Sequence, residues 1–118
     1  MGRVVTALVL ISMVAALRAE PVFTWRPGAK MRVGKGGQVV GLVGGKVLHA
    51  GGTYWAGGKK YWTADLDIYD PATDTWSKGP DLPFPLSYGG GGAVNGALWI
   101  ASGSDGFRDY VETVICRP

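Results

Sequence analysis

The sequence predicts an all-β fold made of many short strands. Twenty of the 118 residues are glycine and five are tryptophan, and both counts are well above average usage. No long segment after residue 20 carries the 3.6-residue period of an amphipathic helix, while turn signals rich in glycine and proline recur along the chain. Short apolar runs separated by such turns are typical of sheets rather than of helices.

Residues 1–19 have the pattern of a secretory signal peptide. Arg3 supplies the positive start, and Val4 to Leu17 is a largely apolar run of 14 residues, which Ala19 follows as a small residue. Val14-Ala15-Ala16 is a second candidate cleavage site. The rival interpretation is a membrane anchor, but a membrane-spanning helix needs about 20 apolar residues. We therefore expect an exported chain, secreted or periplasmic, with no membrane attachment after cleavage.

The charge of the chain does not indicate a nucleic-acid partner. The formal net charge is +3, from 12 basic and 9 acidic residues. Two of the basic residues, Arg3 and Arg18, lie in the expected signal peptide, so the mature chain from Glu20 keeps 10 basic and 9 acidic residues, a net charge of +1. Lys59-Lys60 lies beside aromatic residues but forms no basic stripe, so we expect no binding of nucleic acid.

Residues 37–78 contain four expected strands separated by clear turns. Gly44-Gly45 supplies the positive φ angles of a tight hairpin turn between the first two strands. Asp70-Pro71 begins a turn before the fourth strand, because proline fixes φ and aspartate caps the local backbone. The expected strands are residues 38–43, 46–50, 64–69 and 75–78.

The sequence matches itself when it is shifted by 51 residues. Thr24-Trp25 falls on Thr75-Trp76, and Val43-Gly44-Gly45 falls on Val94-Asn95-Gly96. An internal repeat of this length indicates that one structural unit occurs more than once. It predicts strands at residues 88–94, 97–102 and 110–116, and an outer strand of a preceding unit at residues 22–26.

The doublet Gly51-Gly52 follows an expected strand, Tyr69 follows later, and Trp76 lies seven residues after Tyr69. These three features resemble a kelch repeat, which is one four-stranded blade of a β-propeller with a period of about 50 residues. The resemblance implies an all-β, kelch-type β-propeller in residues 20–118, with blade one at about residues 37–78 and a partial blade two at about residues 87–118. Because a propeller closes with about 4–8 blades, we expect a fragment of a longer propeller, or an assembly of several copies.

The loop between the second and third strands of blade one carries the most specific pattern. Its residues Gly57-Gly58-Lys59-Lys60-Tyr61-Trp62, with the later stretch from Trp76 to Gly89, resemble the sialic-acid mutarotase branch of kelch proteins, also called N-acetylneuraminate epimerases. This resemblance implies a six-bladed, exported enzyme that needs no cofactor and interconverts the α and β anomers of free sialic acid. About two of the six blades are present in this chain.

Loops on one side of the sheets are expected to carry the function. In a blade, the loop from the second to the third strand and the loop to the next blade emerge on the same side, and binding residues favour such loops. Aromatic rings can stack on a sugar, basic side chains can pair with its carboxylate, and Asp105 is the candidate for proton transfer during ring opening. The candidate substrate-binding residues are Tyr54, Trp55, Lys59, Lys60, Trp62 and Arg108.

Several of these residues also have a plain structural explanation. Trp62 is typical of packing within a blade, and Lys59-Lys60 is typical of a solvated loop. His49 lies on an expected strand, where a packed histidine is more common than a catalytic one. Cys116 is the only cysteine, so it allows no disulfide within the chain and no multi-cysteine zinc site. We expect it to act as a small buried apolar residue.

Two other functions compete with the isomerase. A kelch propeller can also act without catalysis, as a module that binds a protein partner or a carbohydrate on its loop side. A copper radical oxidase of the galactose oxidase type needs two histidine ligands and a tyrosine crosslinked to cysteine, which one histidine and one cysteine do not supply. We therefore expect no copper site and no other metal, and the resemblance to the mutarotase branch implies that no cofactor is needed. Blades that are not closed into a ring are expected to self-associate through their exposed edges and faces.

Overall fold

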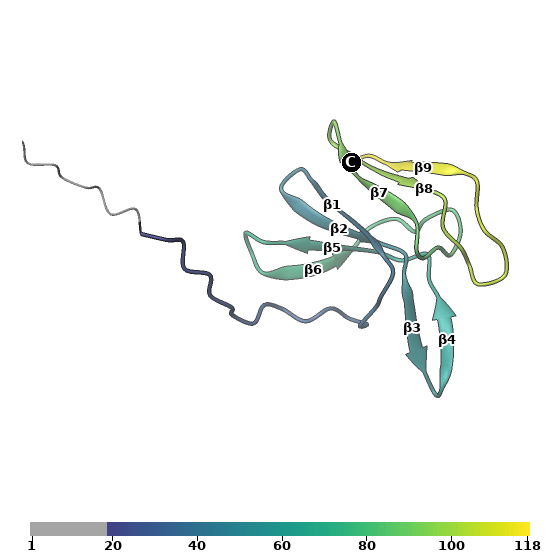
Figure 1. Ribbon diagram of the computed structural model, residues 1–118, viewed down its shortest axis with the longest axis horizontal. Helices are drawn as coiled ribbons and strands as arrows, with labels where there is room; N and C mark the ends of the chain where they lie inside the picture. Colours follow the sequence, from purple (N-terminus) through teal and green to yellow (C-terminus); the bar gives the residue numbers. More distant parts are fainter. Residues whose placement is uncertain (1–18) are drawn as a thin grey trace, which may run out of the picture.

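The computed structural model of the protein describes residues 19–118, so the expected signal peptide, residues 1–19, lies almost entirely outside the described residues. Nine strands and no helix are present in the described part (Figure 1). Accordingly, none of residues 19–118 belongs to a helix that is long and apolar enough to cross a membrane. The all-β prediction is confirmed.

Blade one is a four-stranded antiparallel sheet in the order β1-β2-β5-β6. Its strands are β1 (Val39–Val43), β2 (Lys46–Ala50), β5 (Leu66–Asp70) and β6 (Thr75–Lys78). The expected turn between β1 and β2 is present, with φ angles of 56° at Gly44 and 74° at Gly45. The expected turn before β6 is also present, and the Ala72 amide donates to Asp70 Oδ1 at 3.0 Å.

Blade two has three strands in the described part, in the order β7-β8-β9. They are β7 (Gly90–Val94), β8 (Ala97–Ala101) and β9 (Thr113–Cys116). Asn95 and Gly96 form the expected hairpin turn, with φ angles of 48° and 73°. The expected strand ends in both blades differ from the observed ends by three residues at most.

The structure differs from the sequence prediction at the loop after β2. This segment folds into a second, two-stranded hairpin of β3 (Thr53–Ala56) and β4 (Lys59–Trp62), which projects beyond the ends of the sheets (Figure 1). The turn at its tip is Gly57-Gly58, with φ angles of 56° and 74°, the same pair of conformations as at Gly44-Gly45. The prediction of an irregular loop here was wrong because this glycine doublet was not interpreted as a hairpin turn.

Residues 22–26 form no strand in the described chain and extend away from the sheets (Figure 1). A strand at this place was expected to pair with another blade, which the described residues do not contain. An outer strand at residues 22–26 therefore stays a prediction.

The two blades pack face to face and share one apolar core. At the centre of the contact, Gly41 of β1 lies against β7 and β8. A Cβ added to Gly41 would come within 2.7 Å of Leu98 Cδ1 and 3.1 Å of the Ala93 amide nitrogen. The absence of a side chain at Gly41 therefore sets how closely the blades approach. The buried core residues are Val39, Val43, Leu48, Ala50, Leu66, Leu86, Leu98, Ile100 and Tyr110. Cys116 is partly buried and packs against this core.

Tyr69 and Trp76, the spaced pair that predicted a kelch repeat, tie the preceding chain segment to the outer edge of blade one. Their rings lie 5.1 Å apart between centroids. The Tyr69 hydroxyl donates to Asp74 Oδ1 at 2.7 Å, and the same oxygen accepts the Ala29 amide at 2.8 Å. Trp76 Nε1 donates to the Ala29 carbonyl at 2.9 Å. The spacing of the pair is thus explained by hydrogen bonds to the backbone of Ala29, which Trp76 makes directly and Tyr69 makes through the Asp74 carboxylate.

Candidate functional site on the loop side

The loops that the sequence places on one side of the sheets do meet there. Gly36 pairs with Thr53 in an isolated antiparallel bridge, and Ser87 pairs in the same way with Ser104. The Gly52 amide donates to the Leu86 carbonyl at 2.7 Å. These backbone hydrogen bonds join the segment before β1, the β3-β4 hairpin, the linker between the blades and the loop after β8 into one surface.

The β3-β4 hairpin sorts its side chains onto two faces. Residues that face each other across an antiparallel pair share a face, and alternate residues of a strand lie on opposite faces. Trp55 is opposite Lys60 and Thr53 is opposite Trp62, so these four residues share one face. Tyr54 is opposite Tyr61 on the other face, where the two rings stack 5.3 Å apart.

An open pocket of about 300 Å³ lies between the hairpin and the loop after β8. One wall is the Trp62 ring, which lies 6.4 Å from the Phe107 ring between centroids. A Cβ added to Gly106 would come within 2.4 Å of the Trp62 ring, so the glycine lets the loop lie directly on the indole. The lining residues are Lys59, Lys60, Tyr61, Trp62, Pro85, Asp105 and Phe107.

Trp62 has both the packing role and the pocket-lining role that the sequence left open. Its ring packs on Gly106 and Phe107, and the Lys60 ammonium lies 5.1 Å from its centroid. Among the described residues, Trp62 Nε1 is buried and has no hydrogen-bond acceptor. A buried N–H group without an acceptor costs free energy.

Asp105 closes its own loop through hydrogen bonds. Its Oδ1 accepts the amides of Phe107 at 2.9 Å and Arg108 at 2.8 Å, and its Oδ2 accepts the Tyr110 hydroxyl at 3.0 Å. The backbone amides of Arg108 and Phe107 hold the pKa of this carboxyl below its ordinary value. A carboxylate oxygen has two lone pairs, so Oδ2 keeps one acceptor position for a ligand. Asp105 is therefore ionised at neutral pH, which suits a proton acceptor better than a proton donor.

The other sequence candidates lie outside the pocket. Arg108 donates to Glu112 Oε1 at 2.8 Å and lies 4.5 Å from the centroid of the Tyr110 ring, so its guanidinium already has partners. Tyr54 stacks on the far face of the hairpin, and Trp55 is 69% exposed near the hairpin tip. The structure thus brings Lys59, Lys60, Trp62 and Asp105 into one pocket lining, which does not include Tyr54, Trp55 or Arg108.

Sequence reasoning missed one residue that the structure places next to the pocket. The Lys60 ammonium donates to the hydroxyl of Tyr88 at 2.9 Å and lies 5.1 Å from both the Tyr88 and the Trp62 ring centroids. Tyr88 precedes a run of four glycines and was expected to begin a strand, so nothing in its local pattern indicated an exposed phenol beside a lysine. Tyr61, Pro85 and Phe107 of the lining were also not among the candidates.

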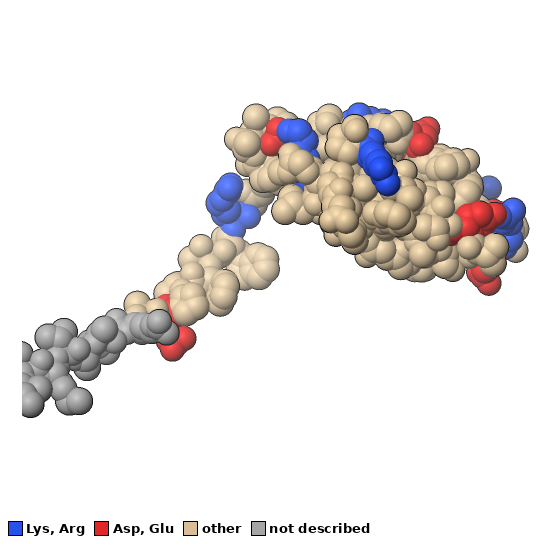
Figure 2. Space-filling model, turned by 90° about the horizontal axis from the view of Figure 1, so that it is seen from above, with Lys and Arg blue, Asp and Glu red and all other residues tan. Residues whose placement is uncertain are grey.

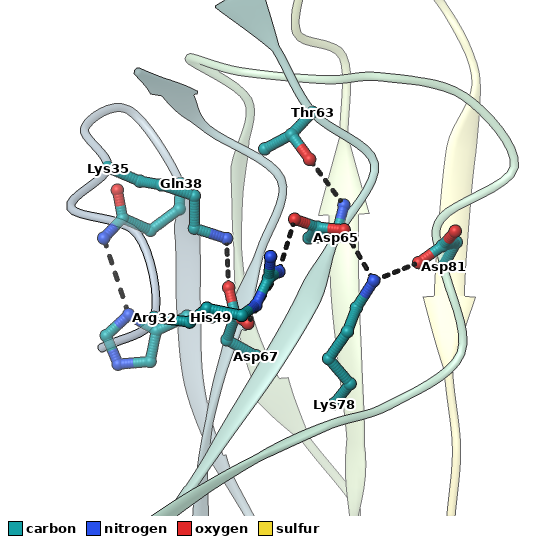
Figure 3. Close-up of polar contacts among 9 residues, drawn as sticks. All are labelled: Arg32, Lys35, Gln38, His49, Thr63, Asp65, Asp67, Lys78 and Asp81. Atoms are coloured by element: carbon teal, nitrogen blue, oxygen red, sulfur yellow. Dashed lines mark hydrogen bonds and ion pairs between the residues drawn. The ribbon is translucent and has the colours of Figure 1, made fainter. Parts of the chain in front are cut away.

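A second polar cluster covers the face of blade one that is turned away from blade two (Figure 3). The Lys35 side chain is fully buried and pairs with Asp67, Arg32 pairs with Asp65 at 2.9 Å, and Lys78 bonds the same carboxylate at 2.8 Å. Lys78 also lies 3.4 Å from Asp81. Three basic and three acidic side chains therefore neutralise one another, which is typical of a structural cluster.

His49 lies beside this cluster and is packed, as its strand position predicted. Its ring meets the Trp76 ring edge-on at 5.0 Å, and Gln38 Nε2 lies 3.5 Å from its Nδ1 (Figure 3). Burial lowers the pKa of the imidazole, and the charge of Lys35 adds to this effect. No group of three or more His, Cys, Asp or Glu side chains within residues 19–118 is arranged to hold a metal ion.

Basic side chains are dispersed over the protein surface. On the face drawn in Figure 2, lysine and arginine side chains lie in separate small groups, some of them beside acidic ones, with uncharged surface between.

Comparison with known proteins agrees with this architecture. The family model of the Kelch motif matches residues 36–83, which include β1 to β6 and the chain just after them. The solved structure of YjhT matches with a TM-score of 0.72 at 20% sequence identity, over 80% of this chain and 32% of the YjhT chain. The protein therefore has the fold of kelch-type β-propeller blades, and it spans about a third of the length of this structural relative.

Proposed function

We propose that this chain carries part of the site of a sialic-acid mutarotase-like isomerase, which interconverts the anomers of N-acetylneuraminate. The observation that carries the proposal is the pocket in which two lysines, the aromatic rings of Trp62 and Phe107 and one ionised carboxylate surround a single space. A sugar acid has an apolar ring face, a carboxylate and an anomeric hydroxyl, and the pocket offers one partner of suitable chemistry for each. The motif from Gly57 to Trp62 supports the same substrate class.

The roles follow from the chemistry of each side chain. Lys59 and Lys60 pair with the sugar carboxylate, because an ammonium group binds a carboxylate through charge-assisted hydrogen bonds. Trp62 and Phe107 contact the apolar face of the ring. Asp105 Oδ2 accepts the proton of the anomeric hydroxyl while the bond between the anomeric carbon and the ring oxygen breaks. Ring closure on the opposite carbonyl face returns the proton and gives the other anomer.

A binding module without catalysis is the second candidate, and two observations favour it. Phe107 is 95% exposed and Trp55 is 69% exposed, and large apolar side chains on projecting loops are typical of surfaces that bind a partner. Asp105 already accepts three hydrogen bonds, which makes it a weaker base. In this case the same pocket binds a carbohydrate or a protein segment, and no proton is transferred.

The experiment is an exchange measurement on free N-acetylneuraminate. Nuclear magnetic resonance follows the approach to anomeric equilibrium with the purified chain, with Asp105→Asn and with Lys46→Met. The asparagine side chain keeps an oxygen for the loop amides but is not a base, so the Asp105→Asn variant should lose acceleration and retain sugar binding. Lys46 lies at the opposite turn and pairs with Asp70, so its substitution should change neither. Binding of the sugar without any acceleration by the wild-type chain would reject the isomerase and favour the binding module.

Export belongs to the same proposal. Free sialic acid as a substrate outside the cytoplasm is consistent with the signal-peptide pattern of residues 1–19, and we propose a secreted or periplasmic protein on that pattern alone.

A further inference from the structure

Tyr88 is held in an uncommon backbone conformation. Its φ angle is 59°, in the left-handed region that bulky residues rarely occupy. Hydrogen bonds hold the backbone that leads into this conformation, since the Tyr88 amide donates to the Gly37 carbonyl at 2.7 Å and Ser87 pairs with Ser104. Such a conformation persists only where the surroundings enforce it, and it is concentrated at functional sites.

The ring of Tyr88 is positioned as firmly as its backbone. A Cβ added to Gly37 would come within 2.7 Å of the Tyr88 ring, so the ring lies flat on the glycine. Despite this contact, Tyr88 remains 60% exposed. The arrangement fixes the ring on one side and presents the phenol to solvent on the other.

The hydrogen bonds of the phenol leave its proton free for a ligand. Lysine has donors only, so the Tyr88 oxygen accepts from Lys60 Nζ at 2.9 Å. The Tyr88 O–H is then available to donate, and its only near partner among the described residues is Thr53 Oγ1 at 3.5 Å, a weak contact. The hydrogen bond from Lys60 lowers the pKa of the phenol.

We propose that the Tyr88 hydroxyl is the proton donor to the ring oxygen of the bound sugar, and that Lys60 orients this hydroxyl and stabilises the phenolate. The inference rests on the proposed isomerase, which leaves this donor unassigned. Lys60 lines the pocket and bonds Tyr88, so one ammonium group links the expected carboxylate site to the phenol. Tyr61 also has an exposed ring beside a lysine, but the Tyr88 phenol in addition accepts a hydrogen bond from its lysine.

The step balances in protons and electrons. The Tyr88 O–H gives its proton to the ring oxygen as the bond from that oxygen to the anomeric carbon breaks with its electron pair. The anomeric hydroxyl gives its proton to Asp105 and becomes the carbonyl of the open chain. After rotation of the carbonyl, the chain hydroxyl adds to the other face and returns its proton to the Tyr88 phenolate, while Asp105 reprotonates the new anomeric oxygen.

A purely structural contact between Lys60 and Tyr88, which fastens the hairpin to the next blade, is the competing explanation. Two readouts separate the explanations. The first is kcat and KM for anomer exchange in the full chain, its Tyr88→Phe variant and its Lys60→Met variant. The second is the phenol pKa of Tyr88. It is obtained by titrating each protein in the ultraviolet and subtracting the titration of the same protein that also carries Tyr88→Phe. Phenylalanine keeps the ring on Gly37, so Tyr88→Phe should remain folded.

We expect Tyr88→Phe to lower kcat by about 10²-fold or more, the usual range for general acid catalysis, with KM little changed. Lys60→Met should lower kcat and move the phenol pKa of Tyr88 up toward its ordinary value. Lys59→Met is the matched control for this titration, because Lys59 lies over Tyr61 and should leave the Tyr88 pKa unchanged.

The outcomes are distinct. A wild-type chain that accelerates exchange, with Tyr88→Phe equally active, overturns this inference and leaves the proposed function standing. A wild-type chain without acceleration rejects the proposed function and the inference together. A phenol pKa that Lys60→Met does not move contradicts the role given to Lys60.

Discussion

Gly51 and Gly44 provide a matched test of what holds the loop side to the sheets. Both have left-handed backbones, with φ angles of 68° and 56°. An added Cβ at Gly44 would meet no atom within 4 Å, whereas at Gly51 it would lie 2.1 Å from the Leu86 carbonyl oxygen. Gly44→Ala and Gly51→Ala therefore share the conformational cost of a side chain at positive φ and differ in the collision.

The expected loss of stability follows from the contacts that the Gly51→Ala side chain must displace. The left-handed conformation costs each variant roughly 1–2 kcal/mol. At Gly51, the Leu86 carbonyl must also move, although it accepts the Gly52 amide at 2.7 Å and Leu86 is only 1% exposed. A buried polar group that loses its partner costs about 1–3 kcal/mol, and the shift also disturbs the packing of Leu86. We expect Gly51→Ala to lower the free energy of unfolding by about 3–5 kcal/mol in total, and Gly44→Ala to lower it by about 1–2 kcal/mol.

The assay is urea unfolding followed by tryptophan fluorescence, with all three proteins at one concentration because any self-association contributes to the measured free energy. Where Gly51→Ala is too unstable to give a folded baseline in urea, hydrogen exchange of the Gly52 amide reports directly on its bond to the Leu86 carbonyl. Equal destabilisation of the two variants would refute the reasoning, since it would show that the linker at Leu86 yields without cost.

Three further predictions concern acid, assembly and processing. The hydrogen bond from Lys78 lowers the pKa of Asp65 from 3.8 to about 2, so the stabilising contribution of Asp65 is present above pH 3.8 and is lost as the pH falls toward 2. Asp65→Asn should lower the free energy of unfolding by about 1 kcal/mol or less at neutral pH and should make that free energy depend less on pH in acid. An unchanged dependence of stability on acid pH would contradict this. Trp99 and Ile115 are 37% and 43% exposed on the outer face of blade two, so we expect self-association in analytical ultracentrifugation that Trp99→Lys weakens; a monomeric wild-type chain with cooperative unfolding would argue against it. Exported material should begin at Glu20 or a few residues earlier, and an intact mass that retains Met1 would exclude this.

Much of the fold follows from local signals in the sequence. A Gly-Gly or Asn-Gly pair at positive φ selects a tight hairpin whatever surrounds it, so Gly44-Gly45 and Asn95-Gly96 located two hairpins correctly. The period of the repeat then placed the strands of blade two from those of blade one. Gly57-Gly58 obeys the same rule, and the β3-β4 hairpin was predictable from it.

Only part of the candidate site could be predicted from the sequence, because a residue's type shows which chemistry its side chain can perform but not which other side chain it contacts. The lysine doublet and Trp62 were identified from their loop, and they line the pocket. The sequence did not show that Arg108 is already paired with Glu112, since that depends on which of several rotamers the folded loop allows.

The contact between Lys60 and Tyr88 shows where local information ends. The sequence by itself determined that a kelch-type sheet forms, that its turns lie at glycine doublets, and that an aromatic, basic loop projects from one side. Only the tertiary structure decided that the Lys60 ammonium reaches a phenol 28 residues away on the next blade. Hairpin turns depend on a few adjacent φ angles, whereas that pairing depends on how closely two blades approach at Gly41 and how the linker at Leu86 crosses between them.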